Sequence, residues 1–127
     1  MISACTPTTG TSVILDKFEP SSYQKADTLY IYRKEAFVGS VAQLFIEVNN
    51  EDVGTIGMGQ IVSAKLRQGT NLLAAIGDIN QRSYNYLLEH NSSKPQYFIA
   101  SYEKSLLVKV TQAEWANLIA KDNKKWQ

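Results

Sequence analysis

A chain of 127 residues, of which 44% are apolar and 20% charged, is long enough for one domain with its own hydrophobic core. Its 13 Lys and Arg residues and 12 Asp and Glu residues leave a formal net charge of +1, which gives no electrostatic footprint for nucleic acid or for a polyanionic substrate. The single cysteine, Cys5, excludes an intrachain disulfide and a zinc site built from cysteine clusters, and no apolar run approaches the length of a transmembrane helix.

The first residues of the chain carry a short motif that ends at its only cysteine. Ile2-Ser3-Ala4-Cys5 resembles the lipobox of bacterial lipoproteins, in which an apolar residue and two small residues precede a cysteine. In that family a signal peptidase cuts before the cysteine, whose sulfur then carries a diacylglyceryl group. The alternative is a chance tetrapeptide in which Cys5 is an idle thiol. Because the cysteine stands at the front of a polar arm, we expect Cys5 to be a lipidation site.

The arm that follows Cys5 is typical of a tether. Residues 6–12 are small, polar or β-branched and have no apolar periodicity, so they cannot bury enough surface to order themselves. Residues 13–15 are either a short first strand or an apolar segment that packs onto the domain. We therefore predict that residues 1–25 comprise a signal-peptide remnant, the lipidation site and a flexible tether, and that residues 26–127 form the folded domain.

Residues 26–35 are dense in β-forming side chains and predict a strand. Its two faces differ, because Leu29 and Ile31 alternate with Tyr30 and Tyr32. One interpretation is a ligand platform, in which the tyrosine rings stack on a ligand and Arg33 pairs with its charge. The interpretation we favour is a core strand whose tyrosine hydroxyls reach the rim and whose arginine makes a structural ion pair.

The central stretch, residues 44–75, organises the rest of the domain. Residues 44–48 alternate between apolar and other side chains with the period of a half-buried strand. Residues 49–52 tolerate turn conformations, and extended structure resumes at residue 53. Residues 70–76 predict a continuous apolar strand of the kind that is buried on both faces.

Three glycines in this stretch, Gly54, Gly57 and Gly59, invite comparison with a phosphate-binding loop. Such a loop would lead into a helix, whereas residues 60–63 predict a strand. We therefore expect these glycines to supply positive φ at a hairpin and a sheet corner.

The C-terminal half predicts three more strands and one helix. The strands cover residues 84–88, 97–102 and 106–110, the last with alternating apolar side chains. Thr111 and Glu114 form a capping box that begins the helix. The apolar face of this helix comes from residues at i, i+3 and i+4 spacing, and the helix is expected to end near residue 121. That face consists of Trp115, Leu118 and Ile119.

These elements predict a mainly β fold, a small antiparallel β-sandwich with one short C-terminal α-helix. Four motifs resemble the DUF2846 domain of bacterial lipoproteins, namely residues 28–33, 48–54, 66–69 and the Tyr97-Phe98 pair, and the middle portion is similar to PEGA-type repeats. The resemblance implies an immunoglobulin- or PEGA-like sandwich on the cell envelope, with no established catalytic residues.

An enzyme is not expected. The single histidine, His90, is predicted in a loop, and a Cys5–His90 dyad would need the arm to be held down. The chain has no recognisable catalytic set, metal-ligand pair or cofactor motif, so we expect no catalytic residue, no metal and no cofactor.

We expect instead a lipid-anchored envelope protein. Through a lipid on Cys5 it would face the periplasm or the cell surface from the outer membrane, because Thr6 is not the aspartate that favours inner-membrane retention. Its partner would be a protein or peptidoglycan, and not nucleic acid. The candidate interaction residues are Tyr30, Tyr32, Arg33, Tyr97 and Phe98. The alternative is a small-ligand carrier with an aromatic pocket between the sheets, lined by the tyrosines and phenylalanine of this set.

Overall fold

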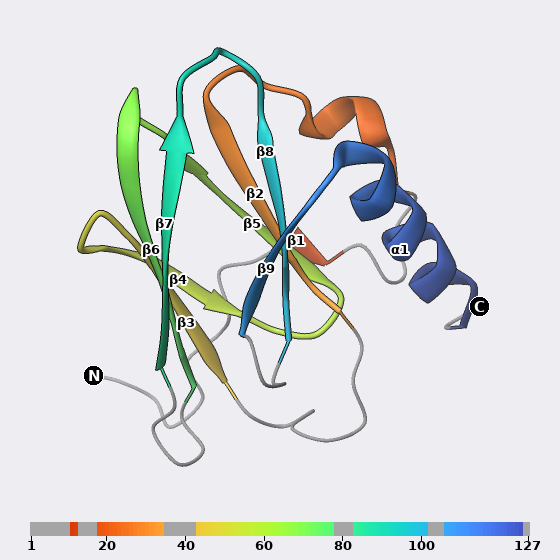
Figure 1. Cartoon of the computed structure of the whole chain (residues 1–127). Coiled ribbons are helices and arrows are strands. Elements are labelled where there is room, and N and C mark those ends of the chain that lie inside the picture. Colours follow the sequence, from red (N-terminus) through yellow and green to blue (C-terminus); the bar gives the residue numbers. More distant parts are fainter. Residues whose placement is uncertain (1–10, 13–17, 35–42, 78–82, 102–105, 126–127) are drawn as a thin grey trace.

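The computed structural model describes residues 11–12, 18–34, 43–77, 83–101 and 106–125, which form two packed sheets and a helix (Figure 1). One sheet has the strand order β1 (Thr11–Ser12), β5 (Gln60–Lys65), β2 (Thr28–Arg33), β8 (Gln96–Ala100) and β9 (Leu107–Val110). The other has the order β4 (Glu51–Ile56), β3 (Leu44–Val48), β6 (Gly69–Gly77) and β7 (Ser83–His90). A 3₁₀ helix, η1 (Pro20–Tyr23), and the C-terminal helix α1 (Gln112–Lys125) complete the fold. The predicted β-sandwich with a C-terminal helix is confirmed.

The main core lies between the two sheets and follows from strand alternation. In β3, Leu44, Ile46 and Val48 are buried, whereas Phe45 and Glu47 are half-buried. Successive side chains of a strand point to opposite faces, so every second residue of β3 enters the core. Apolar side chains from all the long strands meet there, and apolar burial of this kind is the main force that holds two sheets together.

A second core lies on the far side of the five-stranded sheet, beneath α1. Strand β2 is a core strand, as predicted, with both faces covered: Leu29 and Ile31 face the other sheet, while Tyr30 and Tyr32 belong to the cluster under the helix. In Figure 1 the helix lies along this sheet and away from the four-stranded one. Trp115 is buried at the centre of the cluster.

The helix begins as predicted and ends later than predicted. The Thr111 amide donates to Glu114 Oε1 over 2.9 Å and the Glu114 amide donates to Thr111 Oγ1 over 3.1 Å, which is the reciprocal pattern of a capping box. Beyond residue 121 the helix continues to Lys125. Asp122 is buried there and accepts a hydrogen bond from the Tyr32 hydroxyl over 2.8 Å, so a contact with β2 extends the helix by a turn.

Residues with positive φ lie in stretches where the sequence predicted turns. Asn49 and Asn50 have φ values of 53° and 68°, and Val48 pairs with Glu51, which makes β3–β4 a hairpin with a two-residue loop. Gly54 and Gly59 have φ values of 131° and 74°. The predicted positive φ is therefore confirmed for Gly54, beside the register shift of β3 and β4, and for Gly59, in the turn before β5, but it is wrong for Gly57.

Three local predictions differ from the structure. Strand β6 is fully buried only at alternate positions, because its other face is the half-buried outer face of the sandwich. Val108 of β9 is 46% exposed, so the buried residues are Leu106 and Leu107 rather than an alternating set. His90 is the last residue of β7 and is fully buried, not a loop residue.

Most strand pairs are antiparallel, but β2 and β8 run parallel.

The described part of residues 1–25, which the sequence predicted to precede the folded domain, is not a simple tether, because Phe18 and Tyr23 pack against the second core. Cys5 and residues 13–15 lie outside the described residues. No helix in the described ranges has the length and apolar character to span a bilayer.

Candidate functional site

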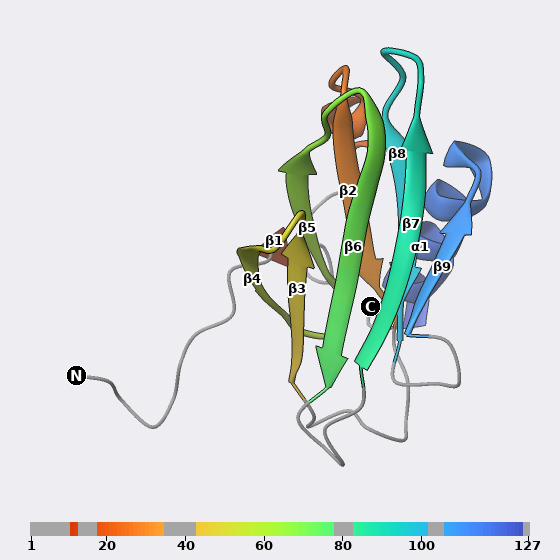
Figure 2. The same ribbon diagram turned by 60° about the vertical axis from the view of Figure 1, so that its left-hand side comes forward.

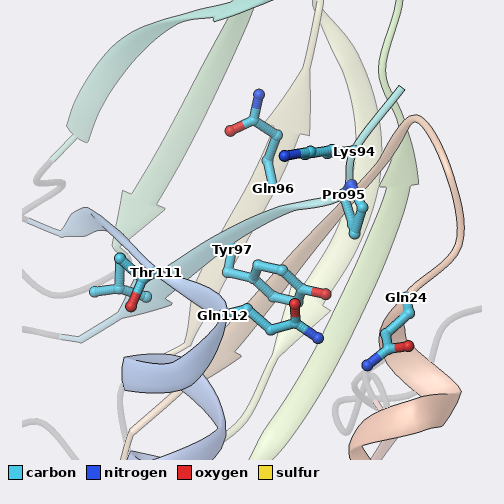
Figure 3. Close-up of a pocket in the computed structure, with 8 residues that line it drawn as sticks. Gln24, Lys94, Pro95, Gln96, Tyr97, Thr111 and Gln112 are labelled. Atoms are coloured by element: carbon cyan, nitrogen blue, oxygen red, sulfur yellow. The ribbon is translucent and has the colours of Figure 1, made fainter. Parts of the chain in front are cut away.

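A cavity of about 520 Å³ lies where η1, the start of β8 and the start of α1 meet (Figure 3). Its walls come from three separate segments of the chain. They are Gln24 after η1, residues 94–97 at the start of β8, and Val110, Thr111 and Gln112 at the junction of β9 and α1. The register places Tyr97 opposite Val110, so β8 and β9 bring the second and third segments together.

The polar groups of this cavity are mostly uncharged. Gln24, Gln96 and Gln112 each carry an amide that can both donate and accept hydrogen bonds, and Lys94 contributes the only charge among the lining residues. In Figure 3, Lys94 and Gln96 lie on one side of the Tyr97 ring and Gln24 and Gln112 on the other. This arrangement suits a ligand with several neutral hydrogen-bonding groups and one negative charge.

Tyr97 forms the inner wall of the cavity. Its hydroxyl donates a hydrogen bond to the Tyr23 carbonyl, which joins β8 to the end of η1. Desolvation by burial, reinforced by the neighbouring Tyr30, raises the pKa of the Tyr97 hydroxyl above its ordinary value of 10.0. Tyr97 therefore stays a neutral hydrogen-bond donor over the whole physiological range of pH.

A group of packed rings holds Tyr97 in place. The Tyr97 and Tyr30 rings stack with centroids 5.8 Å apart, and Trp115 approaches Tyr97 at 4.9 Å. Trp115 Nε1 also donates to the Phe98 carbonyl over 3.1 Å, which fixes the indole against β8. Offset and edge-to-face contacts of this kind add to the stabilisation from apolar burial. The inner wall is accordingly a rigid part of the second core.

The first turn of α1 borders the cavity but is not an open anion site. The Thr111 amide is already bonded to the Glu114 carboxylate. That hydrogen bond to the Thr111 backbone, with a further one to its side chain, lowers the pKa of Glu114 below its ordinary value of 4.5. A negative charge therefore already lies at the N-terminal end of α1, where the helix dipole is positive.

Gln96 connects the cavity to a buried histidine. Gln96 Nε2 lies 3.1 Å from His90 Nδ1, and His90 Nε2 lies 2.8 Å from Asp27 Oδ1. Because an amide nitrogen only donates, Nδ1 accepts, and Nε2 carries the proton that it donates to Asp27. Gln68 Nε2 donates to the same Asp27 oxygen over 3.1 Å. Both ring nitrogens of His90 are thus used in joining the end of β7 to Asp27, just before β2, and to Gln96, the first residue of β8.

Two other cavities, of about 490 and 360 Å³, are both lined by Ala64 and Lys65 at the end of β5. Two acidic and two basic residues line the larger one, namely Glu51, Asp52, Lys65 and Arg67. That cavity presents charges of both signs, whereas the cavity beside Tyr97 presents three amides, a hydroxyl and one ammonium, and we take the latter as the candidate site. Among the described residues no three His, Cys, Asp or Glu side chains gather as metal ligands.

No family model, curated protein or solved structure matches the chain. The family resemblance drawn from the sequence therefore stays a prediction.

The structure buries all the aromatic and arginine residues that the sequence singled out. Tyr30, Tyr32 and Tyr97 lie under α1, whereas Phe98 is on the opposite face of the same sheet, in the main core. Arg33 is 3% exposed and its Nη1 donates to the Ile56 carbonyl over 3.0 Å, so it bridges the two sheets instead of facing a ligand.

An exposed platform made of these residues is therefore wrong. A pocket between the sheets lined by the tyrosines and Phe98 is wrong too, because buried apolar side chains fill that space. Of the three cavities described above, Tyr97 lines the first and Tyr30 lines the smallest, while Tyr32, Arg33 and Phe98 line none of them. The lipidation site, Cys5, lies outside the described residues.

Sequence reasoning missed the polar wall of the cavity. Gln24, Lys94 and Gln112 belong to no motif, and glutamine and lysine are ordinary surface residues. One usable signal was the capping box, which located the start of the helix and with it Gln112. The long-range pairing of β8 with β9 could not be read from local patterns.

Proposed function

We propose that the protein is a non-enzymatic binding module of the bacterial cell envelope, anchored by a lipid on Cys5, and that it binds peptidoglycan in the cavity beside Tyr97. The observation that carries the binding proposal is the lining of this cavity, which combines three glutamine amides and a threonine hydroxyl with one lysine. Peptidoglycan offers sugar hydroxyl and amide groups together with peptide carboxylates, which are the partners these side chains would take.

The anchor rests on the lipobox-like tetrapeptide that ends at Cys5. A single acyl chain binds a bilayer only marginally, so stable anchoring needs a multiply acylated cysteine. Expressed in a bacterium behind a lipoprotein signal peptide, the wild-type chain should fractionate with the membrane. Cys5→Ser should move to the soluble envelope fraction, and its retention on the membrane would contradict the anchor.

The binding proposal is tested with a soluble disaccharide-peptide fragment of peptidoglycan as the probe. Its affinity for the soluble Cys5→Ser protein is measured by calorimetry or by NMR titration. Gln112→Ala and Lys94→Ala each remove one hydrogen-bonding partner, and we expect each to weaken binding about tenfold, because a lost hydrogen bond costs about 1.4 kcal/mol.

Two matched controls stand away from the cavity. Asn117→Ala removes an exposed amide from α1, and Lys109→Ala removes an exposed ammonium from β9. Both should bind like the parent protein. If the parent does not bind the fragment, or if all four variants bind alike, the cavity is not a peptidoglycan site.

A further inference from the structure

The four edges of the two sheets are protected to different degrees. Within the described ranges, β1 covers two residues and β9 covers four, including Lys109. The pairing of β4 shifts register beside Ile46, and that strand begins with two carboxylates. These are the usual devices that keep an edge strand from pairing with another chain. Strand β7, with eight residues, has no proline, lysine or register shift.

Strand β7 also presents an apolar side chain to solvent. It is the last strand of its sheet among the described residues, and Figure 2 shows it at that end. Its outward side chains are those of Ser83, Asn85, Leu87 and Glu89, all of them exposed. Leu87 is 67% exposed, the larger of the two values for exposed large apolar side chains in the described ranges. A long edge with an exposed leucine at its middle is the pattern of a strand that pairs with a partner.

We propose that β7 pairs antiparallel with β7 of a second copy, with Leu87 opposite the second copy's Leu87. Residues directly opposite in an antiparallel pair share a face. On the outer face this register places Asn85 opposite the second copy's Glu89, so an amide meets each carboxylate. On the inner face it places Tyr86 opposite the second copy's Leu88, which extends the main core across the interface.

The charges of the sheet leave little repulsion between two copies that pair through β7. The four strands of this sheet carry four carboxylates and no lysine or arginine. Glu47, Glu51 and Asp52 lie on β3 and β4, and β6 separates them from β7. At about 4.8 Å per strand they are roughly 10 Å or more from β7 and farther from the second copy, beyond the Debye length of about 8 Å.

Glu89 is the remaining carboxylate, and its Oε2 already accepts a hydrogen bond from Thr70 Oγ1. Across the interface it faces neutral Asn85 rather than another acid. In this register no two like charges of β7 therefore lie opposite each other. A basic strand from a different protein is the competing occupant, and the experiment separates the two.

The oligomeric state of the soluble Cys5→Ser protein is measured by sedimentation over a wide range of concentration. We expect a dimer. Leu87→Lys adds a positive charge at the centre of the interface and should raise the dissociation constant at least about tenfold, a change of about 1.4 kcal/mol. Val108→Lys makes the same change at the exposed apolar residue of the β9 edge and should leave the dimer intact. A monomeric parent, or equal dimerisation of the two variants, would overturn the proposal.

The proposed register of the two β7 strands is tested separately by cysteine cross-linking. A disulfide should link two copies of Leu87→Cys, because residues directly opposite have Cβ atoms about 5 Å apart. Asn85→Cys should not link, since the two Asn85 positions are offset by four residues, or about 13 Å, along the strands. Urea denaturation confirms that each variant is folded. If the parent stays monomeric and protects its β7 amides from exchange only when an alternating Lys–Leu peptide is added, the occupant is a basic partner and not a second copy.

Discussion

Tyr32 donates a hydrogen bond to Asp122 across 2.8 Å, and both side chains are buried. The contact joins β2, in the middle of one sheet, to the last part of α1, 90 residues later in the chain. It explains why the helix runs past residue 121 and why a carboxylate lies on its inner face. The second core, which holds Tyr97 in the cavity, is closed at this end by the Tyr32–Asp122 pair.

Tyr32→Phe should destabilise the protein by about 1–2 kcal/mol, because it removes a donor from a buried carboxylate. The free energy of unfolding from urea denaturation measures the loss. Tyr84→Phe changes a half-buried tyrosine on β7 and should have little effect. If the two substitutions cost the same, the hydrogen bond to Asp122 contributes no measurable stability.

The capping box predicts a dependence of stability on acid pH. Because the pKa of Glu114 is lowered in the folded state, its charge stabilises the fold above the ordinary pKa of 4.5 that it has in the unfolded chain. This contribution is lost as the pH falls through the folded pKa. Glu114→Gln keeps the shape of the capping side chain and removes the charge. The variant should be less stable than the wild type at neutral pH, and the difference in free energy of unfolding should shrink at low pH.

A difference that stayed constant down to the acid limit would mean that the Glu114 carboxylate does not act through its charge. Helicity followed by circular dichroism in the same titration shows whether α1 frays from its first turn.

Tyr97 predicts the opposite dependence at alkaline pH. Its pKa is raised by burial and by Tyr30, so the folded state holds the hydroxyl proton more tightly than the unfolded state. The associated stability is complete below the unfolded pKa of about 10 and is lost as the pH rises through the folded pKa. Tyr97→Phe should remove one late ionisation from the absorbance titration of tyrosinate. If the missing ionisation falls at the ordinary value, the hydroxyl is not desolvated.

The sequence predicted the parts of the fold that depend on neighbouring residues. Alternation in residues 44–48, a turn within residues 49–52 and the capping box at Thr111 are local patterns, although β4 resumes at residue 51 and not at 53 as predicted. The buried contacts of His90 are different. Its partners are Asp27, 63 residues away, and Gln96, and nothing in the flanking residues distinguishes a buried histidine from an exposed one.

The cavity could not be predicted from the sequence, because it too depends on contacts between residues far apart in the chain. Its walls come from three segments that meet because β2 pairs parallel with β8 and β8 pairs with β9. Parallel pairing needs a long crossover, and its register is set by the whole core rather than by a turn. The aromatic residues were candidate interaction residues in the sequence because their side chains are large. Their size is also the reason that the fold buries them.

The β3–β4 turn offers a pair of substitutions with opposite expected signs. Both turn residues have positive φ, which matches a type I′ turn, and glycine is the preferred residue at its second position. Asn50→Gly should therefore stabilise the protein by about 0.5 kcal/mol, as relief of the left-handed strain slightly exceeds the entropy cost of glycine. Asn49→Gly should instead destabilise it by about 1–2 kcal/mol.

Asn49→Gly is expected to destabilise the protein because the Asn49 side chain makes two hydrogen bonds. Its Oδ1 accepts from the Leu72 amide and its Nδ2 donates to Asn71 Oδ1, each over 2.9 Å, which ties the turn to β6. Glycine at this position relieves the same backbone strain but loses both bonds. Urea denaturation of the two variants and the wild type separates the effects. Equal stability changes at the two positions would show that backbone conformation alone governs this hairpin.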